Sequence, residues 1–220
     1  MTIGLNIRWN EIRYVEIKEY LALMDNAKDI WWRGFLSIAY GSGLRRNETL
    51  NLTWKNIDFD NQLITVTTKK ESKNLLKWEP KSRRNRVVPM SDETSQLLVD
   101  IQVRAPEGHP YVFVSPKRLG RIKDRRKAGK WNTRSELVNN IARRFNEIRS
   151  QANVAKCTIH DLRRSAITNG AQQLPIQVVQ TLAGHSDIKT TRKYYLAVRP
   201  EDFTSASKVL KHILAKTHAD

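Results

Sequence analysis

The stretch LITVTTKKESKNLLKWEPKSRRNRVVP, residues 63–89, holds the clearest strand signals in the chain. LITVTT at its start is rich in β-branched residues, which favour strands, and RVVP at its end is a second, shorter strand candidate. The residues between them, 69–86, are polar and strongly basic. We therefore expect a small antiparallel β-structure whose two strands are joined by a long basic connection.

Helical patterns flank this β-structure on both sides. Apolar residues recur at mostly helical spacing, Ser91 is placed to cap one helix, and Gly184 is placed to end another. YVFVS at 111–115 is a candidate further strand. The sequence thus predicts one α+β domain that is mainly helical, with helices at 10–24, from 29 to 41 or 43, 46–52, 91–103, 134–152, 160–172, 175–183, 188–195 and 200–216.

The charge of the chain points to a polyanionic partner. Lys and Arg number 39 against 22 Asp and Glu, a formal net charge of +17 over 220 residues. Such an excess is typical of nucleic-acid binding, because neutralising phosphates releases counterions. A basic ribosomal-type scaffold and a membrane-surface binder are the alternatives.

The single cysteine, Cys157, excludes an internal disulfide framework and fits a reducing compartment. No apolar run approaches the roughly 18 residues of a membrane span. We therefore expect a cytoplasmic protein.

Two segments place arginine beside groups that can handle phosphate. HDLRRS sets His160 and Arg163 three residues apart, on one face of a helix. GSGLRRNETLNLTW sets Arg45 at the start of a helix, with Glu48 three residues on. Arginine offers a fork of donors that matches phosphate oxygens, and a neutral histidine can accept or donate a proton. Each segment alone is equally an ordinary helix face or a helix–turn–helix joint.

A third segment, LAGHSDIKTTRKYY, places His185 in a turn and Tyr194 nine residues later, followed by Tyr195. Tyrosine is a slow nucleophile at its free pKa of about 10, so it needs neighbouring cations or a base to ionise as it attacks. The alternative is a pair of helix tyrosines with their rings in the core.

Together, the three segments closely resemble the tyrosine recombinase (phage integrase) family in order and internal spacing, over nearly the whole chain. The resemblance implies the fold of that family's catalytic domain and a lysine on the β-hairpin. EPKSRRNRVVP resembles the family's hairpin and points to Lys81. The same basic stretch offers other lysines: Lys69, Lys70, Lys73 and Lys77.

The resemblance also implies the reaction. Tyr194 attacks the phosphorus of a DNA backbone and forms a 3′-phosphotyrosyl link. Arg45 and Arg163 grip the non-bridging oxygens, and Lys81 protonates the leaving 5′-oxygen.

The remaining groups support these four. His160 assists proton transfer from Tyr194, His185 hydrogen-bonds the phosphate, and Glu48 orients the cluster. The scheme requires no metal or other cofactor, because guanidinium groups neutralise the charge. Cys157 and His160 have zinc-like spacing without a second cysteine, so we expect a buried free thiol.

Members of the family usually carry an N-terminal core-binding domain. We expect residues 1–220 to form the catalytic domain without it, with 200–217 either docking on a neighbouring subunit or packing on its own domain. The expected partner is double-stranded DNA, bound by a homotetramer on paired sites, with a monomer possible without DNA, in association with the nucleoid.

Two rival functions stay open at this point. A type IB topoisomerase-like enzyme uses similar chemistry to nick and close one duplex. A DNA-binding regulator would keep the fold without cutting. The basic segment 117–130 is expected to be a loop, either a solvated insertion or a DNA contact.

Overall fold

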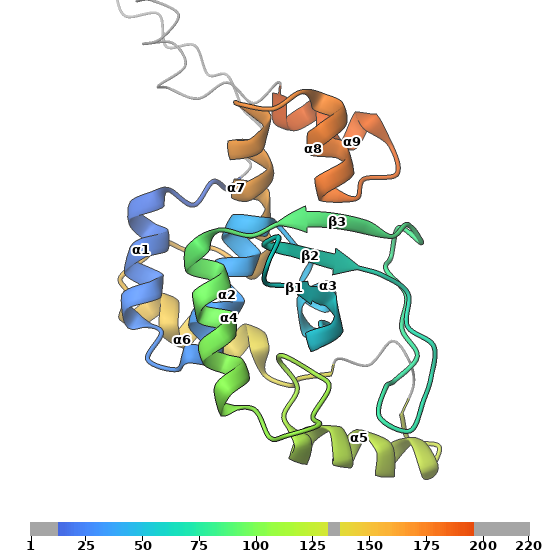
Figure 1. Cartoon of the computed structure of the whole chain (residues 1–220). Coiled ribbons are helices and arrows are strands. Elements are labelled where there is room, and N and C mark those ends of the chain that lie inside the picture. The colour runs from blue at the N-terminus through green and yellow to red at the C-terminus, as the bar shows by residue number, and fades with distance from the viewer. Residues whose placement is uncertain (1–12, 132–136, 196–220) are drawn as a thin grey trace, which may run out of the picture.

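In the computed structural model, which describes residues 13–131 and 137–195, helices surround a small sheet (Figure 1). Strands β1 (Ile57–Asp58), β2 (Leu63–Val66) and β3 (Arg86–Pro89) pair antiparallel in that order. Ile64 lies opposite Val88, and both side chains are buried. The two predicted strands are confirmed, although β2 ends two residues earlier than expected.

The elements before the sheet form a helical layer against it. They are α1 (Ile17–Asn26), α2 (Ile30–Ser37), a π-helical turn η1 (Ile38–Ser42), α3 (Arg46–Leu50) and a 3₁₀ turn η2 (Trp54–Asn56). The Asp29 side chain caps α2 by accepting a hydrogen bond from the backbone N–H of Trp31 at 3.0 Å. Gly43 has φ +63° and ends the π-helical turn in the left-handed conformation, as glycine does at helix ends.

The first helix begins later than predicted. Residues 13–16 are not helical, and α1 begins after Glu16. The backbone of Val15 is held by other elements: its N–H donates to Ser165 Oγ at 2.7 Å, and its carbonyl accepts from the Tyr40 hydroxyl at 3.1 Å. These tertiary bonds replace the helical ones that the apolar spacing predicted. Residues 10–12 of the predicted helix lie outside the described part of the chain.

After the sheet come α4 (Asp92–Arg104), α5 (Pro116–Lys127) and α6 (Ile141–Gln151). Ser91 caps α4, as predicted. The prediction of a loop at 117–130 is wrong, because most of this segment is helix α5, capped by Ser115 and anchored by a buried apolar side. Residues 111–115 contribute a single bridge, Tyr111 to Thr53, rather than a strand.

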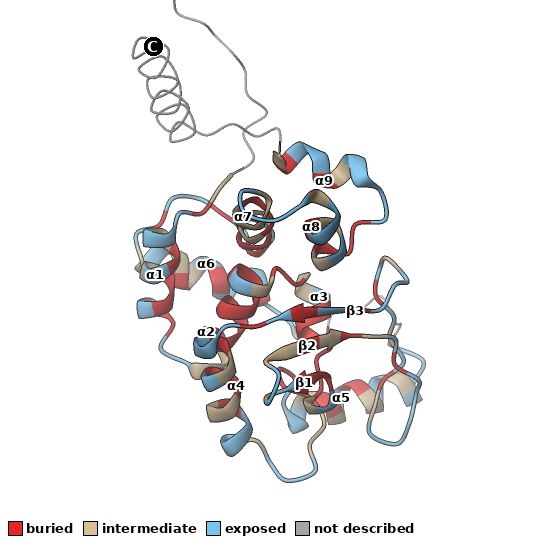
Figure 2. Cartoon of the chain, turned by 45° about the horizontal axis from the view of Figure 1, so that its top comes forward, coloured by how far each residue is buried: buried red, intermediate tan, exposed pale blue. Residues whose placement is uncertain are grey.

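The C-terminal helices α7 (Ile159–Ala171), α8 (Ile176–Ala183) and α9 (Ile188–Tyr195) lie close to their predicted bounds. Helix α7 packs against η1 of the large core, while α8 and α9 pack on the far end of α7 around a second, smaller apolar cluster. Figure 2 shows buried residues along the inner sides of these helices and exposed residues facing outward. The predicted helix at 200–216 lies outside the described residues.

Cys157 is a buried free thiol, as expected. In residues 13–131 and 137–195, no helix is long and apolar enough to cross a bilayer.

Candidate active site

Glu48, on α3, lies at the centre of a buried ionic cluster. Its carboxylate accepts from the Arg45 backbone N–H at 2.8 Å and from Arg45 Nη1 at 3.0 Å. It also accepts two bonds from Arg86, at 3.1 and 2.6 Å. Burial alone would raise the pKa of the Glu48 carboxyl, but the hydrogen bonds and charges of Arg86 and Arg45 outweigh it and hold that pKa below its ordinary value. Glu48 is therefore an anion that fixes two guanidinium groups, which agrees with the orienting role predicted for it.

Arg86 is the residue that sequence reasoning missed. Its side chain is 3 % exposed and forms a two-bond ion pair with Glu48, while its Nε donates to Leu182 O at 2.9 Å. A signal was present: Arg86 and Val88 are two apart in a strand and so share a face, and that face is buried. An arginine on a core-facing strand position requires a buried anion, and Glu48 supplies it.

Three arginines meet the C-terminal end of α8. Arg86 reaches the carbonyl of Leu182, Arg163 reaches that of Ala183 at 2.6 Å, and Arg45 reaches that of Gly184 at 3.1 Å. Helix C-termini carry partial negative charge and carbonyls without helical partners, so cations are favourable there. These bonds join α3, β3 and α7 to the turn that follows α8.

Arg163 is buried at 2 % exposure and also donates to the Gly43 carbonyl. Burial first, and then the neighbouring Arg45, lower its pKa to about 9, so it stays charged at neutral pH. The two glycines that bracket the cluster are both left-handed. A Cβ on Gly184 would come within 2.9 Å of Arg86 Nη1, so the turn can pass the guanidinium group only as glycine.

His185 lies directly after that turn and is buried. Its Nε2 faces Arg163 Nη2 at 3.5 Å, and its Nδ1 lies 2.9 Å from Thr191 Oγ1. Because arginine can only donate, Nε2 is the accepting nitrogen, so Nδ1 carries the proton and donates to Thr191. Burial, followed by the charges of Arg163 and Arg45, lowers the pKa of His185 to about 4. The imidazole is therefore neutral at physiological pH.

Tyr194 is packed against this histidine. The two rings stack with centroids 6.0 Å apart and 16° between their planes, and Tyr194 is 5 % exposed. The Nζ atom of Lys193 lies 5.4 Å from the centroid of the Tyr194 ring. Tyr195 points elsewhere, because its hydroxyl donates to Leu174 O at 2.5 Å. Of the two adjacent tyrosines, only Tyr194 contacts His185.

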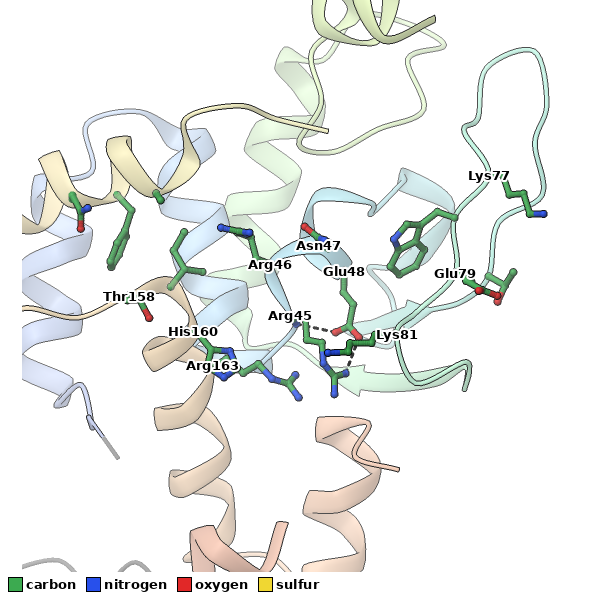
Figure 3. A pocket seen from close by; sticks show the side chains of 16 residues that line it. Arg45, Arg46, Asn47, Glu48, Lys77, Glu79, Lys81, Thr158, His160 and Arg163 are labelled. Carbon is green, nitrogen blue, oxygen red and sulfur yellow. Dashed lines mark hydrogen bonds and ion pairs between the residues drawn. The ribbon is translucent and has the colours of Figure 1, made fainter. Parts of the chain in front are cut away.

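A cleft of about 1040 Å³ opens beside the cluster (Figure 3). Its walls come from α3, the β2–β3 connection, α6 and the start of α7. Arg45, Lys81, His160 and Arg163 all line it, whereas His185 and Tyr194 lie behind it. The lining residues are Arg45, Arg46, Asn47, Glu48, Thr68, Lys77, Trp78, Glu79, Lys81, Ala142, Phe145, Asn146, Thr158, Ile159, His160 and Arg163.

His160 lies in the first turn of α7 with an exposed side chain. Partial burial, together with the charges of Arg164 and Arg163, lowers the pKa of His160 below its usual value. It is therefore also a neutral imidazole near pH 7, and it can accept a proton.

The lysines of the β2–β3 connection occupy different environments. Lys77 and Lys81 are exposed and line the cleft. Lys69 does not line it: its amine is buried between the rings of Trp78 and Tyr111, with centroids 5.8 and 5.6 Å away. Lys70 and Lys73 are exposed and do not line the cleft either. The structure thus brings Lys81 to the cleft beside Arg45, where its sequence position placed it.

Known proteins resemble this chain over most of its length. The chain is 24% identical over 92% of its residues to a XerC-like tyrosine recombinase of Caldanaerobacter subterraneus, and covers 55% of that protein. It is 27% identical over 81% of its residues to the tyrosine recombinase XerA of Pyrococcus horikoshii, and covers 54% of it. The chain therefore spans about half the length of these curated relatives.

Solved structures show the same fold. A crystal structure of XerA recombinase matches 89% of the chain with a TM-score of 0.65 at 21% identity, and 62% of that structure is covered. The catalytic domain of bacteriophage HP1 integrase matches 90% of the chain with a TM-score of 0.56 at 20% identity, and 95% of that domain is covered.

The model of the phage integrase family matches residues 13–201, a span that contains the arginine cluster, the cleft and both tyrosines. This chain belongs to the phage integrase family.

Proposed function

We propose that this chain is the catalytic domain of a site-specific DNA recombinase that cuts and rejoins DNA strands through Tyr194. The observation that carries the proposal is the arrangement of Arg45, Arg163 and Lys81 around one cleft, with His185 and Tyr194 stacked behind it. Relatives described as tyrosine recombinases, and a solved XerH recombinase bound to a palindromic difH substrate, support DNA as the partner.

In the proposed step, the Tyr194 oxygen forms a bond to the phosphorus while the bond to the 5′-oxygen breaks. Two groups move protons: the neutral His160 accepts the tyrosine proton, and Lys81 donates one to the leaving 5′-oxygen. Arg45 and Arg163 donate to the non-bridging oxygens, whose negative charge grows in the transition state.

His185 supports the same transition state from behind the cleft. Its neutral ring is held by Thr191 on one side and Arg163 on the other. Turning Nε2 or its bound proton toward the phosphate requires a change of tautomer or of ring position. We propose that bound phosphate draws Arg163 away from the Ala183 carbonyl and brings this change about.

Tyr194 must also move. Its ring packs in the small cluster with Ile167, Val179 and Ala183 and does not line the cleft. The described structure therefore holds the nucleophile away from the DNA cleft, and α9 has to shift before attack. The phosphotyrosyl bond keeps the energy of the broken phosphodiester, so a 5′-hydroxyl can reverse the attack and join strands without ATP.

The test is covalent trapping on a nicked suicide duplex, in which the released 5′-fragment diffuses away. Wild-type protein is expected to form an adduct that resists denaturation, and Tyr194→Phe none. Tyr195→Phe is the matched control, since it removes the neighbouring hydroxyl and should leave the adduct. No adduct with wild-type protein, or an undiminished adduct with Tyr194→Phe, would refute the proposal.

The role of Lys81 has its own test. A substrate with sulfur in place of the 5′-bridging oxygen leaves as a thiolate and needs no proton. Lys81→Ala should cut the oxygen substrate at least about 100-fold more slowly, the usual size of a general-acid effect, and should recover on the sulfur substrate. Lys77→Ala, which removes another amine lining the cleft, is the control. Equal losses on both substrates would show that Lys81 does not donate the proton.

We further propose that the protein recombines paired DNA sites as a homotetramer, on the nucleoid of the cell. Transfer of a labelled strand between two duplexes separates this from topoisomerase-like activity, which would relax supercoils without transfer. Sedimentation of the protein with one site and with two sites would measure the assembly. A complex that never exceeds one protein per duplex would contradict the tetramer.

A further inference from the structure

Helix α5 carries a dense positive charge that the proposed reaction does not use. Seven of its twelve residues are Lys or Arg, and one is Asp. Its buried side is narrow and consists of Leu119 and Ile122. Nearly all of the charge is therefore left at the surface or at its margin.

The exposed charges form a row along the helix. Lys117, Arg121 and Arg125 are four residues apart and exposed, so they lie on one face over about 12 Å. Lys127 is exposed at the end of the helix. Like charges at this spacing repel one another and destabilise a helix slightly, so a row of three is a cost that an anionic ligand would remove.

The helix is fixed in place by its other arginines. Arg118 donates to Leu137 O and to Asn139 Oδ1, each at 2.7 Å. Arg126 pairs with Glu71, in the β2–β3 connection, at 2.7 Å. The row of exposed cations is therefore held on a rigid element, tied to the connection that carries Lys81.

A surface hollow links α5 to the cleft. A second, smaller pocket is lined by Arg126 and Trp131 on one side and by Asn47, Lys77 and Trp78 on the other. The last three residues also line the cleft. Figure 1 shows the β2–β3 connection running from the sheet toward α5. The hollowed surface thus continues from the proposed cleavage site to the end of α5.

We propose that the exposed face of α5 binds the phosphate backbone of duplex DNA that flanks the cleavage site. The inference rests on the proposed function, because it takes the cleft to hold the scissile phosphate. Lysines and arginines in a row neutralise phosphates without reading bases, so this contact adds affinity and orientation rather than sequence preference.

The experiment compares wild-type protein with the triple variant Lys117→Gln/Arg121→Gln/Lys127→Gln. The matched control is Lys28→Gln/Lys55→Gln/Arg104→Gln, which removes three exposed charges that do not line either pocket. Binding is measured on duplexes lengthened in 5-base-pair steps on each side of the nick, at several salt concentrations. Circular dichroism checks that both variants keep the helical content of the wild type.

Wild-type affinity is expected to increase as one flank is lengthened, and the α5 variant should lose that increase. Each lost phosphate contact lowers the slope of log affinity against log salt by about 0.9. Three lost contacts would therefore narrow the gap between wild type and variant by about 40-fold between 50 and 200 mM salt. The control should keep the wild-type length dependence.

Three outcomes would overturn the proposal: an unchanged salt slope in the α5 variant, an equal loss at every duplex length, or an equal loss in the control. A variant that loses self-association but keeps DNA affinity would identify α5 as a protein contact instead. Trapping on the shortest duplex at saturating protein tests the proposed function separately. The α5 variant should form as much adduct there as the wild type, and only failure of the wild type would count against the chemistry.

Discussion

Lys69→Met is expected to stabilise the fold, by an amount that depends on pH. The Lys69 side chain is 7 % exposed, and its Nζ has no hydrogen-bond partner among the described residues. Burial lowers the pKa of this amine from 10.5 to about 7. Methionine keeps an unbranched apolar chain of similar length against Trp78 and Tyr111 and removes the amine.

The magnitude follows from linkage. Between pH 7 and 10.5 the unfolded chain holds a proton on Lys69 that the folded chain releases, so folded stability rises with pH across this window and the penalty is greatest at or below pH 7. A shift from 10.5 to about 7 corresponds to about 4 kcal/mol of destabilisation at pH 7 and about 2 kcal/mol at pH 9. Attraction of the charged amine to the two aromatic rings, about 0.5–1 kcal/mol each, offsets part of this and brings the pH 7 value to about 3 kcal/mol.

The assay is urea unfolding of wild type and Lys69→Met at pH 7 and pH 9, extrapolated to water. The variant should be more stable by about 3 kcal/mol at pH 7 and by about 2 kcal/mol at pH 9, because only the wild type gains from deprotonation. Lys70→Met, at an exposed neighbour, should differ little from the wild type at either pH. Equal stability of Lys69→Met and wild type, or a gain that grows with pH, would refute the buried, unpaired amine.

Other substitutions probe the arginine cluster and the turn after α8. Glu48→Gln leaves the buried Arg86 without its anion and should cost about 3–5 kcal/mol in the free energy of unfolding; a drop below about 1 kcal/mol would mean that the pair is solvated. Gly184→Ala places a side chain at φ +62°, which costs about 1–2 kcal/mol, and within 2.9 Å of Arg86, so trapping should fall while DNA affinity is kept; normal trapping rates would contradict the tight turn. Thr191→Val removes a hydrogen bond of about 1 kcal/mol from His185 and should slow cleavage about fivefold, with an unchanged rate arguing against that support. Since burial and cations lower the pKa of His185 to about 4, the wild-type cleavage rate should show no loss near pH 6.5 that disappears in His185→Gln.

Much of the site was predictable because its parts are local. Gly184 ends a helix wherever a left-handed residue is needed, so the position of His185 in a turn follows from the sequence. His160 and Arg163 share a helix face by periodicity alone. The spacing of such groups within one segment survives folding, which is why three short segments predicted the family.

The errors came from non-local contacts. Helix α5 has the composition of a solvated basic loop, and only the burial of Leu119 and Ile122 together with the bonds of Arg118 to residues 137–139 makes it a stable helix. The first helix begins late because Val15 bonds to residues that are 25 and 150 positions away. Periodicity carries no information about such partners.

The sequence by itself determined the chemistry: which guanidinium, imidazole and phenol groups exist, and that they lie in three helical segments around a small basic hairpin. Only the tertiary structure decided how these groups meet. It joined Arg86 to Glu48, set three arginines on the end of α8, separated the cleft-lining Lys81 from the buried Lys69, and stacked Tyr194 behind the cleft. The reason is physical: a charge can be buried only where a partner from another element arrives, and that partner is fixed by packing across the whole core.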